Sequence, residues 1–338
     1  MRRYLHASVT RISDLERLPF ELHTLPRDRW ATADYVVAEV IGPSHHPFEI
    51  ANGRLVEAVT GDLVIGALGQ RSATLEVVGD WRSTGPDSEM HALTGAGLFG
   101  LATSVSNWLL PLTPLRYKGH VMRDGHKLTM QDYVRPLAPV LPAAPVILII
   151  GTSMSAGKTT AARIVVRMLA NRGLRVLGTK LTGAARYRDI LSCLDVGATN
   201  VLDFVDAGLP STVCDESDYL PALEHLLARM AALQPDVIIA EAGASPMEPY
   251  NGALAYERLK PLVQLSILCA SDPYAVLGVQ DAFRLTPDVV AGPAANTTAA
   301  VQLVERLTGV RALNLLDRGG AEELRLLLEQ QIVEPLQC

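Results

Sequence analysis

The stretch Val146-Ile-Leu-Ile-Ile-Gly151-Thr-Ser-Met-Ser-Ala-Gly157-Lys158-Thr159-Thr160 decides the fold of the second half of the chain. It opens with an apolar, mostly β-branched run, which is typical of a parallel strand buried on both faces. Residues 159–171 are predicted to form a helix that ends near Gly173. A strand, a loop of small residues and a helix in this order predict a phosphate-binding P-loop.

The residue types of this loop fit phosphate binding. Glycines let successive backbone N–H groups turn toward phosphate oxygens, and the following helix directs its positive end at the same anion. We expect Lys158 to reach the β- and γ-phosphates and the Thr159 hydroxyl to ligate Mg²⁺. The predicted cofactor contacts are Gly151, Thr152, Ser155, Ala156, Gly157, Lys158, Thr159 and Thr160.

Strands and helices alternate after the loop. Strands are predicted at 174–178, 237–240, 265–270, 289–291 and 311–315, and helices at 220–232 and 297–307. Because such alternation is typical of parallel sheets, residues 146–338 are predicted to form an α/β domain with helices on both faces of a parallel sheet.

Residues 1–138 have a different character. Short β-rich runs at 35–41, 62–68 and 73–78 are separated by turn signals, and residues 93–103 are predicted to be a packed helix or turn. This part is therefore predicted to be a smaller, mostly-β domain, with Trp30, Trp81 and Trp108 as core or interdomain anchors. Residues 139–145 continue a proline-rich stretch and are predicted to be an extended linker.

Composition excludes several functions. The 338 residues are 49% hydrophobic and 20% charged, with a net charge of −6 and no basic stripe, so nucleic acid is not expected as a partner. The four cysteines and the histidines lack metal-site spacing, and the cysteines are expected to be reduced thiols. No apolar run is long enough for a signal peptide or a membrane span, so a cytoplasmic protein with no membrane partner is expected.

The five-residue spacing between Gly151 and Gly157 resembles the loop of dethiobiotin synthetase and its relatives, within the signal-recognition/MinD-like class of P-loop proteins. Residues 178–183 (Gly-Thr-Lys-Leu-Thr-Gly) are similar to that family's Lys-Pro-x-x-[Ser/Thr]-Gly. Residues 241–245 (Glu-Ala-Gly-Ala-Ser) look like its Glu-Gly-Ala-Gly-Gly, and residues 289–296 resemble its Gly-x-Val-x-Asn. The resemblance covers roughly residues 146–316.

The resemblance implies ATP and Mg²⁺ as cofactors. It makes Lys180 a second cation over the transferred phosphoryl group, and Glu241 a metal-holding carboxylate at the end of its strand. Asn296 would read the nucleotide base, although it could equally cap the helix that starts at Thr297. The chain departs from the family at Ser153 and Met154, where an acidic and a polar residue are usual, and at Ala242, which replaces a glycine.

A second resemblance concerns residues 202–208. They are similar to a poorly characterised P-loop family related to dethiobiotin synthetase, some of whose members are thought to be amino-acid N-acyltransferases. The N-terminal domain of that family is Rossmann-like, and residues 1–138 show no such pattern.

Substrate contacts are expected in the loops that follow the strands. Arg186 and Arg188 could clamp an anion or simply begin a solvated helix. Asp195, Asp203 and Asp206 could assist a metal or a substrate amine, or serve as caps, and residues 271–273 could reach the same crevice. The candidate substrate residues are Thr182, Gly183, Arg186, Arg188, Gly243, Ala244, Ser245, Glu248 and Asn251.

The favoured function is an ATP- and Mg²⁺-dependent enzyme of the ligase or kinase type, which activates or phosphorylates a small anionic metabolite. Lys158, Lys180 and Glu241 would be its catalytic residues, and Thr159 and Glu241 its metal ligands. One alternative is a nucleotide-dependent switch or chaperone, an ATPase or GTPase. Another is an N-acyltransferase whose P-loop holds the phosphates of coenzyme A. A homodimer is expected because related enzymes often form one.

Overall fold

The computed structural model describes residues 4–243, 245 and 247–337. The chain divides into two compact units. The first, the barrel unit, comprises Met1–Leu137, Ala184–Arg188 and Phe204–Ala222; the second, the P-loop unit, comprises Ala138–Gly183, Asp189–Asp203 and Leu223–Cys338. Two short segments from the middle of the chain therefore pack with the N-terminal residues, an exchange that the contiguous domains expected from the sequence do not include.

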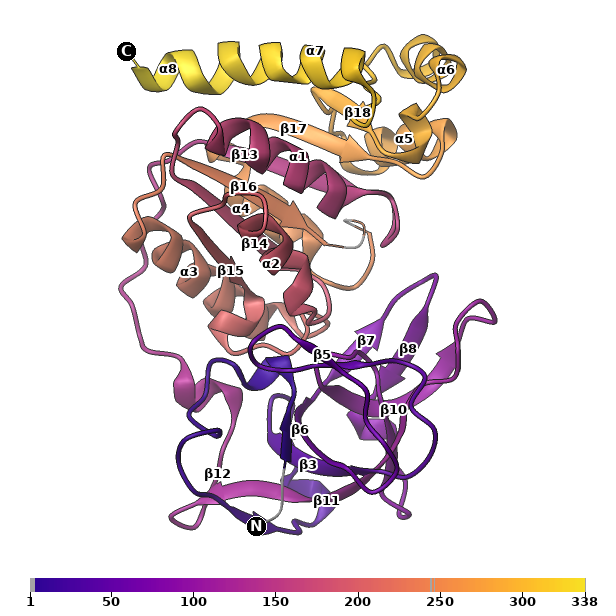
Figure 1. Ribbon diagram of the computed structural model, residues 1–338, viewed down its shortest axis with the longest axis vertical. Coiled ribbons are helices and arrows are strands. Elements are labelled where there is room, and N and C mark those ends of the chain that lie inside the picture. Colours follow the sequence, from indigo (N-terminus) through magenta and orange to yellow (C-terminus); the bar gives the residue numbers. More distant parts are fainter. Residues whose placement is uncertain (1–3, 244, 246, 338) are drawn as a thin grey trace. The chain divides into compact units, whose positions relative to one another are not determined.

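The barrel unit is built from short strands joined by turns (Figure 1). Its 3₁₀ helices are η1 (Ser8–Thr10), η2 (Arg27–Arg29), η3 (Trp81–Ser83), η4 (Met130–Tyr133) and η5 (Phe204–Ala207). Its strands are β1 (Tyr4–His6), β2 (Glu21–His23), β3 (Tyr35–Val40), β4 (Phe48–Glu49), β5 (Leu55–Val56), β6 (Leu63–Leu68), β7 (Gln70–Ser72), β8 (Val77–Asp80), β9 (Glu89–Ala92), β10 (Leu98–Val105), β11 (Pro114–Arg123) and β12 (His126–Lys127).

The main sheet of this unit closes on itself. The order β6–β3–β11–β9–β10 is antiparallel throughout, and β10 returns to β6 through a parallel pairing of Leu98 with Ala67 and Phe99 with Leu68. Closure removes the free edges of these strands. Gly66 makes room inside, because a Cβ there would lie 2.5 Å from the Phe99 ring. The unit is thus a closed barrel with a packed interior.

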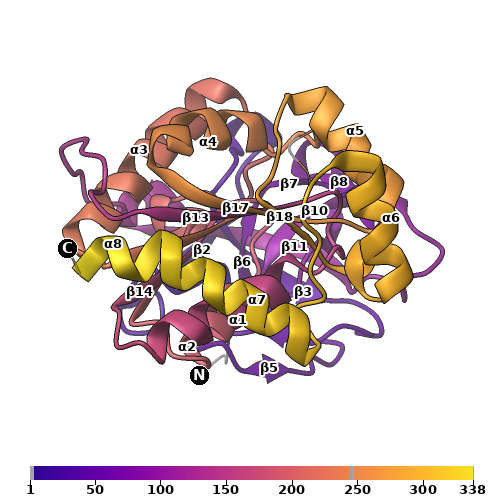
Figure 2. The same cartoon turned by 90° about the horizontal axis from the view of Figure 1, so that it is seen from above.

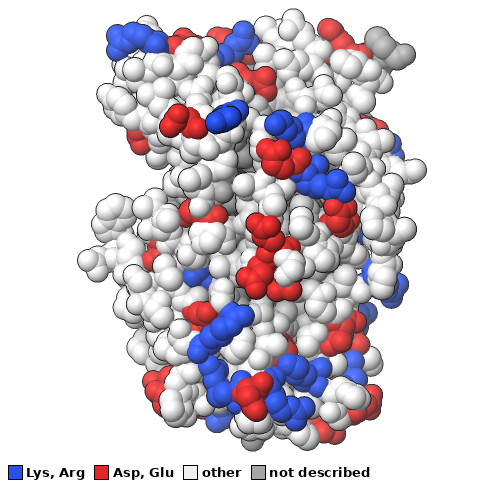
Figure 3. All heavy atoms as spheres, turned by 180° about the vertical axis from the view of Figure 1, so that it is seen from behind, with Lys and Arg blue, Asp and Glu red and all other residues white. Residues whose placement is uncertain are grey.

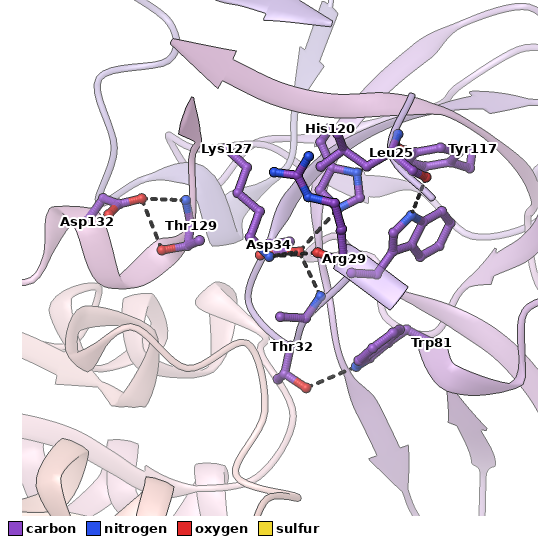
Figure 4. Close-up of polar contacts among 12 residues, drawn as sticks. Leu25, Arg29, Thr32, Asp34, Trp81, Tyr117, His120, Lys127, Thr129 and Asp132 are labelled. Carbon is purple, nitrogen blue, oxygen red and sulfur yellow. Dashed lines mark hydrogen bonds and ion pairs between the residues drawn. The ribbon is translucent and has the colours of Figure 1, made fainter. Parts of the chain in front are cut away.

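A buried polar network ties β3 to β11 (Figure 4). The Asp34 carboxylate, which is fully buried, accepts from His120 Nε2 at 3.1 Å and from Lys127 Nζ at 2.8 Å. His120 Nδ1 lies 2.6 Å from the Tyr117 hydroxyl, whose oxygen accepts from the Leu25 amide. Both of these contacts to Asp34 use its Oδ2, whereas its Oδ1 is buried without a hydrogen-bond partner among the described residues.

Three local predictions for this half were wrong. Residues 73–76 form a turn between β7 and β8, so the predicted strand at 73–78 is split. Residues 93–97 form bends and a turn, as one of the two alternatives predicted, but residues 98–105 are a strand, because β10 closes the barrel. Trp30 and Trp81 are buried as anchors, but Trp108 is 88% exposed and anchors nothing.

The P-loop unit has a six-stranded sheet in the order β15-β14-β16-β13-β17-β18, and all of its pairings are parallel. Its strands are β13 (Val146–Gly151), β14 (Val176–Thr182), β15 (Asn200–Asp203), β16 (Val237–Ala242), β17 (Val263–Cys269) and β18 (Val289–Ala291). The α/β class predicted from the alternation is confirmed. The predicted strand at 311–315 is not formed, since Ala312 makes only an isolated bridge to Val290.

Helices cover both faces of this sheet (Figure 2). Residues of α1 and α7 share one apolar core with the strands, including Val165, Leu169, Ile239 and Leu324. The helices are α1 (Lys158–Ala170), α2 (Tyr187–Leu194), α3 (Glu216–Ala232), α4 (Gly252–Leu259), α5 (Pro273–Phe283), α6 (Thr298–Thr308), α7 (Arg318–Leu328) and α8 (Glu334–Gln337), with short turns η6 (Lys260–Leu262), η7 (Pro293–Ala295) and the π-turn η8 (Glu329–Val333).

The two middle segments of the barrel unit are held by specific contacts. Arg11 pairs with Asp206 at 2.9 Å, and its guanidinium lies over the Tyr187 ring. The Gln131 side chain donates to the Gly208 carbonyl at 3.1 Å. These contacts join residues that are far apart in the sequence, which explains why local pattern could not assign the segments to the first unit.

Charged groups of both signs are interspersed on the face in Figure 3. Within the part of the chain that the structure describes, no helix is both long and apolar enough to cross a bilayer.

Candidate functional site

The predicted P-loop lies where its sequence placed it. Strand β13 ends at Gly151, and α1 begins at Lys158 after a loop with no regular structure. Gly157 has a φ of 97°, a conformation that side chains with a Cβ rarely adopt, and it turns the chain into α1. A Cβ on Gly151 would lie 2.9 Å from the Lys158 side chain, so this glycine lets the lysine fold back over the loop.

Lys158 is a buried cation. It is 3% exposed, and its Nζ donates to the Ser153 carbonyl at 2.7 Å. Burial lowers the pKa of Lys158, while the nearby Glu241 carboxylate acts in the opposite direction. A buried ammonium ion held mainly by a carbonyl is poorly compensated. An anion bound in the loop, such as a phosphate, would supply the missing countercharge.

Three charged residues form one row across the neighbouring strands. Lys180 of β14 is the register partner of both Glu241 on β16 and Asp203 on β15. Register partners on adjacent parallel strands point to the same side of a sheet. Glu241 is also the partner of Ile149, just before the loop. The row therefore extends across β16 and β14, from the neighbour of the P-loop strand β13 to the edge strand β15.

Lys180 has carboxylate neighbours both within this row and outside it. Lys180 Nζ pairs with Asp189 at 2.7 Å, and Lys180 and Glu241 are each 7% exposed. Burial acts to lower the pKa of Lys180, but the carboxylates of Asp189 and Glu241 outweigh it and raise that pKa. Lys180 is consequently held in its charged form. Burial also raises the pKa of Glu241, against the pull of the Lys180 and Lys158 ammonium groups.

The donor set between the loop and this row fits Mg²⁺. The Thr159 hydroxyl lies 3.3 Å from the Glu241 carboxylate, and both are hard oxygen ligands of the kind that Mg²⁺ prefers. In the described ranges, no group of three or more His, Cys, Asp or Glu side chains is placed to hold a metal by itself.

Thr182 and Gly243 meet at the ends of β14 and β16. The Thr182 hydroxyl donates to the Gly243 carbonyl at 3.1 Å, and a Cβ on Gly243 would come within 2.1 Å of the Thr182 carbonyl oxygen. Ala244 lies outside the described residues. The Ser245 amide donates to the buried Glu248 carboxylate at 2.6 Å, and this carboxylate opposes the lowering of the Lys158 pKa by burial. The structure thus brings Glu248 electrostatically close to the loop lysine.

The loop after β18 touches the P-loop directly. Gly292 has a φ of 83°, and a Cβ there would lie 2.3 Å from the Ala156 carbonyl oxygen. Thr297, not Asn296, caps α6 by accepting from the Ala300 amide at 3.2 Å. The capping alternative for Asn296 is therefore wrong. The Asn296 side chain is exposed next to a loop that contacts the phosphate cradle.

Other candidates have different surroundings. Arg186 and Arg188 are exposed, and both belong to the barrel unit. Asp206 is paired with Arg11, and Asp195 is exposed at the end of α2.

The remaining candidates lie in the loops of the P-loop unit. Ser155 and Thr160 are exposed at the P-loop, and Gly183 is buried after β14. Asn251 lies at the N-cap position of α4 and has a φ of 61°. Ser271 donates through its amide to the Thr152 hydroxyl at 3.0 Å, while Asp272 caps α5.

Two residues of functional interest were not singled out from the sequence. Asp189 pairs with Lys180, and Glu49 binds the first amides of α2. Neither belongs to a motif. Asp189 lies close in sequence to the Lys180 segment and could have been suggested by that proximity, whereas nothing in the pattern around Glu49 points to α2.

Comparisons with known proteins do not identify a family for this chain. No family model matches the chain, and no curated protein sequence matches it. Among solved structures, chloroplast FtsY from Physcomitrella patens aligns with 13% identity over 54% of this chain and 62% of its own, with a TM-score of 0.37. Hydrogenase maturation factor HypB from Archaeoglobus fulgidus aligns with 15% identity over 55% of this chain and 89% of its own, with a TM-score of 0.38. Cell division protein FtsY from Thermotoga maritima aligns with 15% identity over 55% of this chain and 67% of its own, with a TM-score of 0.35.

The match spans less than two thirds of the Physcomitrella chain. Scores this low carry no argument about activity, and they do not single out the dethiobiotin synthetase type. The strand, loop and helix of residues 146–170 in a parallel sheet give the second unit the architecture of a P-loop domain.

Proposed function

We propose that the protein is a Mg²⁺-dependent, nucleotide-binding enzyme that uses ATP to activate or phosphorylate a small anionic metabolite. One observation carries this proposal: Lys180, a buried and charged lysine, stands in register with Glu241 on the strand next to that of the P-loop. A nucleotide-binding loop alone requires one lysine. A second buried cation beside the metal-binding carboxylate supports transfer of a phosphoryl group to an acceptor.

Each residue of the site has a part in this chemistry. The loop amides and Lys158 would bind and orient the phosphate chain, with the positive end of α1 directed at it. Thr159 and Glu241 would hold Mg²⁺, which supplies charge neutralisation at the phosphate oxygens when bound. Lys180, kept protonated by Asp189, would stabilise negative charge on the phosphoryl group.

The acceptor would bind beside Lys180. Thr182 and Gly243 close the strand ends there, and the buried Glu248 lies electrostatically near Lys158. A dethiobiotin synthetase-like reaction, in which a carboxylate or carbamate attacks the γ-phosphoryl group, is consistent with this arrangement. Glu248 could take the place of the acid that the loop lacks at Ser153.

Calorimetric titration with ATP, GTP and acetyl-CoA, each with Mg²⁺, tests the proposal. We expect ATP to bind and Lys158→Ala to abolish binding, because the phosphate chain loses its buried cation. Lys118→Ala is the matched control, since Lys118 is exposed and pairs with Glu39. Binding of acetyl-CoA without ATP would instead support the acyltransferase alternative. ADP release that begins only when a metabolite pool is added would support the enzyme.

A nucleotide-driven switch is the second candidate. It is favoured by the assignment of residues 184–188, which directly follow the Lys180 segment, to the barrel unit. In a switch, exchange of ATP for ADP would change the protection of backbone amides in residues 184–222, as measured by hydrogen exchange. Steady ADP release without any added metabolite, together with such a change, would favour the switch over the enzyme.

A further inference from the structure

Exposed apolar side chains gather at one tip of the barrel unit. The tip consists of the turn between β7 and β8 and the loop between β10 and β11 (Figure 1). These two segments are joined, because Val105 pairs with Val77 and the Ser106 amide donates to the Glu76 carbonyl at 2.8 Å. Five apolar side chains, from 38% to 88% exposed, form what we call the apolar tip: Leu75, Val78, Val105, Trp108 and Leu110.

The turn that carries Trp108 has a defined backbone. The Ser106 hydroxyl accepts from the Trp108 amide at 3.4 Å, and the Ser106 carbonyl accepts from the Leu109 amide at 3.0 Å. One residue further on, the Leu110 carbonyl lies 3.1 Å from Nε2 of the His46 ring. These bonds hold the loop in a conformation that directs the largest apolar side chain of the tip, the Trp108 indole, into solvent.

The loop of the apolar tip carries no charge. No Lys, Arg, His, Asp or Glu occurs in the sequence between His91 and Arg116. The acidic residue of the β7–β8 turn, Glu76, is paired with the buried Arg71. Removing an unpaired charge from water costs far more free energy than removing apolar groups, which is itself favourable. The apolar tip can therefore leave water without the desolvation of an unpaired ion.

These properties select one kind of partner. Exposed apolar residues are ordinary when scattered, whereas a group of them marks an interaction surface. A stable dimer needs about 20–30 residues from each copy, many more than the apolar tip offers. A bilayer needs no complementary shape, and tryptophan is favoured at the boundary between its headgroups and acyl chains.

We propose that the apolar tip inserts into the interfacial layer of an uncharged phospholipid surface and docks the protein there reversibly. This differs from the expectation of no membrane partner, which rested on the absence of an apolar run long enough to span a bilayer. Interfacial insertion of a loop requires no such run. The inference is independent of the proposed function, because it concerns the barrel unit and needs no nucleotide.

Flotation of the full chain with phosphatidylcholine vesicles tests the proposal. We expect the wild-type protein to float with the vesicles and Trp108→Ser to lower its partition coefficient by about tenfold, because the largest apolar side chain of the tip is lost. Leu110→Ser should lower the coefficient by a smaller factor. Leu18→Ser is the matched control: Leu18 is 49% exposed, and it precedes Pro19, which bonds to Arg123 at the opposite end of β11. This control should partition like the wild type.

Tryptophan fluorescence locates the contact. Trp30 and Trp81 are buried, so quenching by acrylamide in water reports mainly on Trp108. Vesicles should shift the emission to shorter wavelength and protect it from acrylamide, and lipids brominated near the headgroup should quench it. Because Leu110→Ser keeps all three tryptophans, its smaller shift can be compared directly with that of the wild type.

Other results would overturn the proposal. The apolar tip has no cationic side chain and the chain has a net charge of −6, so phosphatidylglycerol should not strengthen binding and salt should not weaken it. Binding that requires anionic lipid and disappears in salt would contradict insertion of the tip, as would no binding to phosphatidylcholine. A dimer seen by sedimentation velocity without lipid, and lost in Trp108→Ser, would show that a second copy covers the tip instead.

Discussion

Lys180 and Glu241 are register partners on adjacent parallel strands, so a buried ammonium ion and a buried carboxylate face the same side of the sheet. Glu241 also reaches Thr159 at the start of α1, and Lys180 reaches Asp189 in α2. The pair therefore stands between the phosphate loop and the place where an acceptor would bind.

Glu241→Gln and Thr159→Ala should raise the Mg²⁺ concentration needed for nucleotide binding by about tenfold to a hundredfold, because each removes an oxygen ligand or its charge. Nucleotide affinity measured in a Mg²⁺ titration checks this. Thr103→Ala removes an exposed hydroxyl of the barrel unit and should leave the requirement as it is. An unchanged Mg²⁺ dependence in Glu241→Gln would remove that residue from the metal site.

Lys180→Ala should separate binding from turnover. Since Lys158 and the loop amides hold the phosphate chain, we expect MgATP affinity to stay within a few fold, while metabolite-dependent ADP release falls by about a hundredfold or more. Calorimetry and a coupled ADP assay measure the two quantities. A loss of affinity as complete as that in Lys158→Ala would contradict the assigned role.

Gly292→Ala should destabilise the P-loop unit by about 1–3 kcal/mol and weaken nucleotide binding. Its φ of 83° disfavours alanine, and the added Cβ would lie 2.3 Å from the Ala156 carbonyl oxygen. Gly278→Ala is the matched change: Gly278 lies in α5 with open space around it, so alanine should stabilise the protein by about 0.5–1 kcal/mol. Urea denaturation compares the two, and equal effects would argue against the close loop contact.

Asp34→Ala should destabilise the barrel unit by about 3–5 kcal/mol, because it leaves His120 and Lys127 without their buried acceptor. The exposed pair of Glu89 and Arg116 provides the comparison, and Glu89→Gln should cost less than about 1 kcal/mol. Urea unfolding followed by tryptophan fluorescence reports on this unit. Similar costs for both variants would show that the buried network contributes little.

The barrel unit should also lose stability in acid through Asp14. Hydrogen bonds from Arg123 hold the pKa of Asp14 below its ordinary value, although burial opposes them. A carboxyl whose pKa is lower in the folded state stabilises the fold above its unfolded pKa, and this contribution disappears as the pH falls through the folded pKa. Melting temperatures of wild type and Asp14→Asn should therefore differ near neutrality and converge in acid. A difference that persists in acid would contradict this assignment.

The fold of the P-loop unit was predictable because its signals are local. An apolar strand, a glycine-containing loop and an amphipathic helix are adjacent in the chain, so the P-loop and the order of β13, α1 and β14 follow from pattern alone. The barrel was harder to predict. Its closure depends on the pairing of Leu98 and Phe99, in β10, with β6. The sequence of residues 93–103 has no local pattern that predicts this strand.

The sequence by itself determined the P-loop geometry at residues 151–160, because backbone freedom at two glycines and one lysine at the start of a helix suffice for it. It also marked Lys180 and Glu241 as separate strand-end candidates. Only the tertiary structure decided that they stand side by side and that Asp189 neutralises Lys180. The physical reason is that ion pairs and helix-end contacts depend on distances between residues remote in the chain, and strand register and packing set those distances.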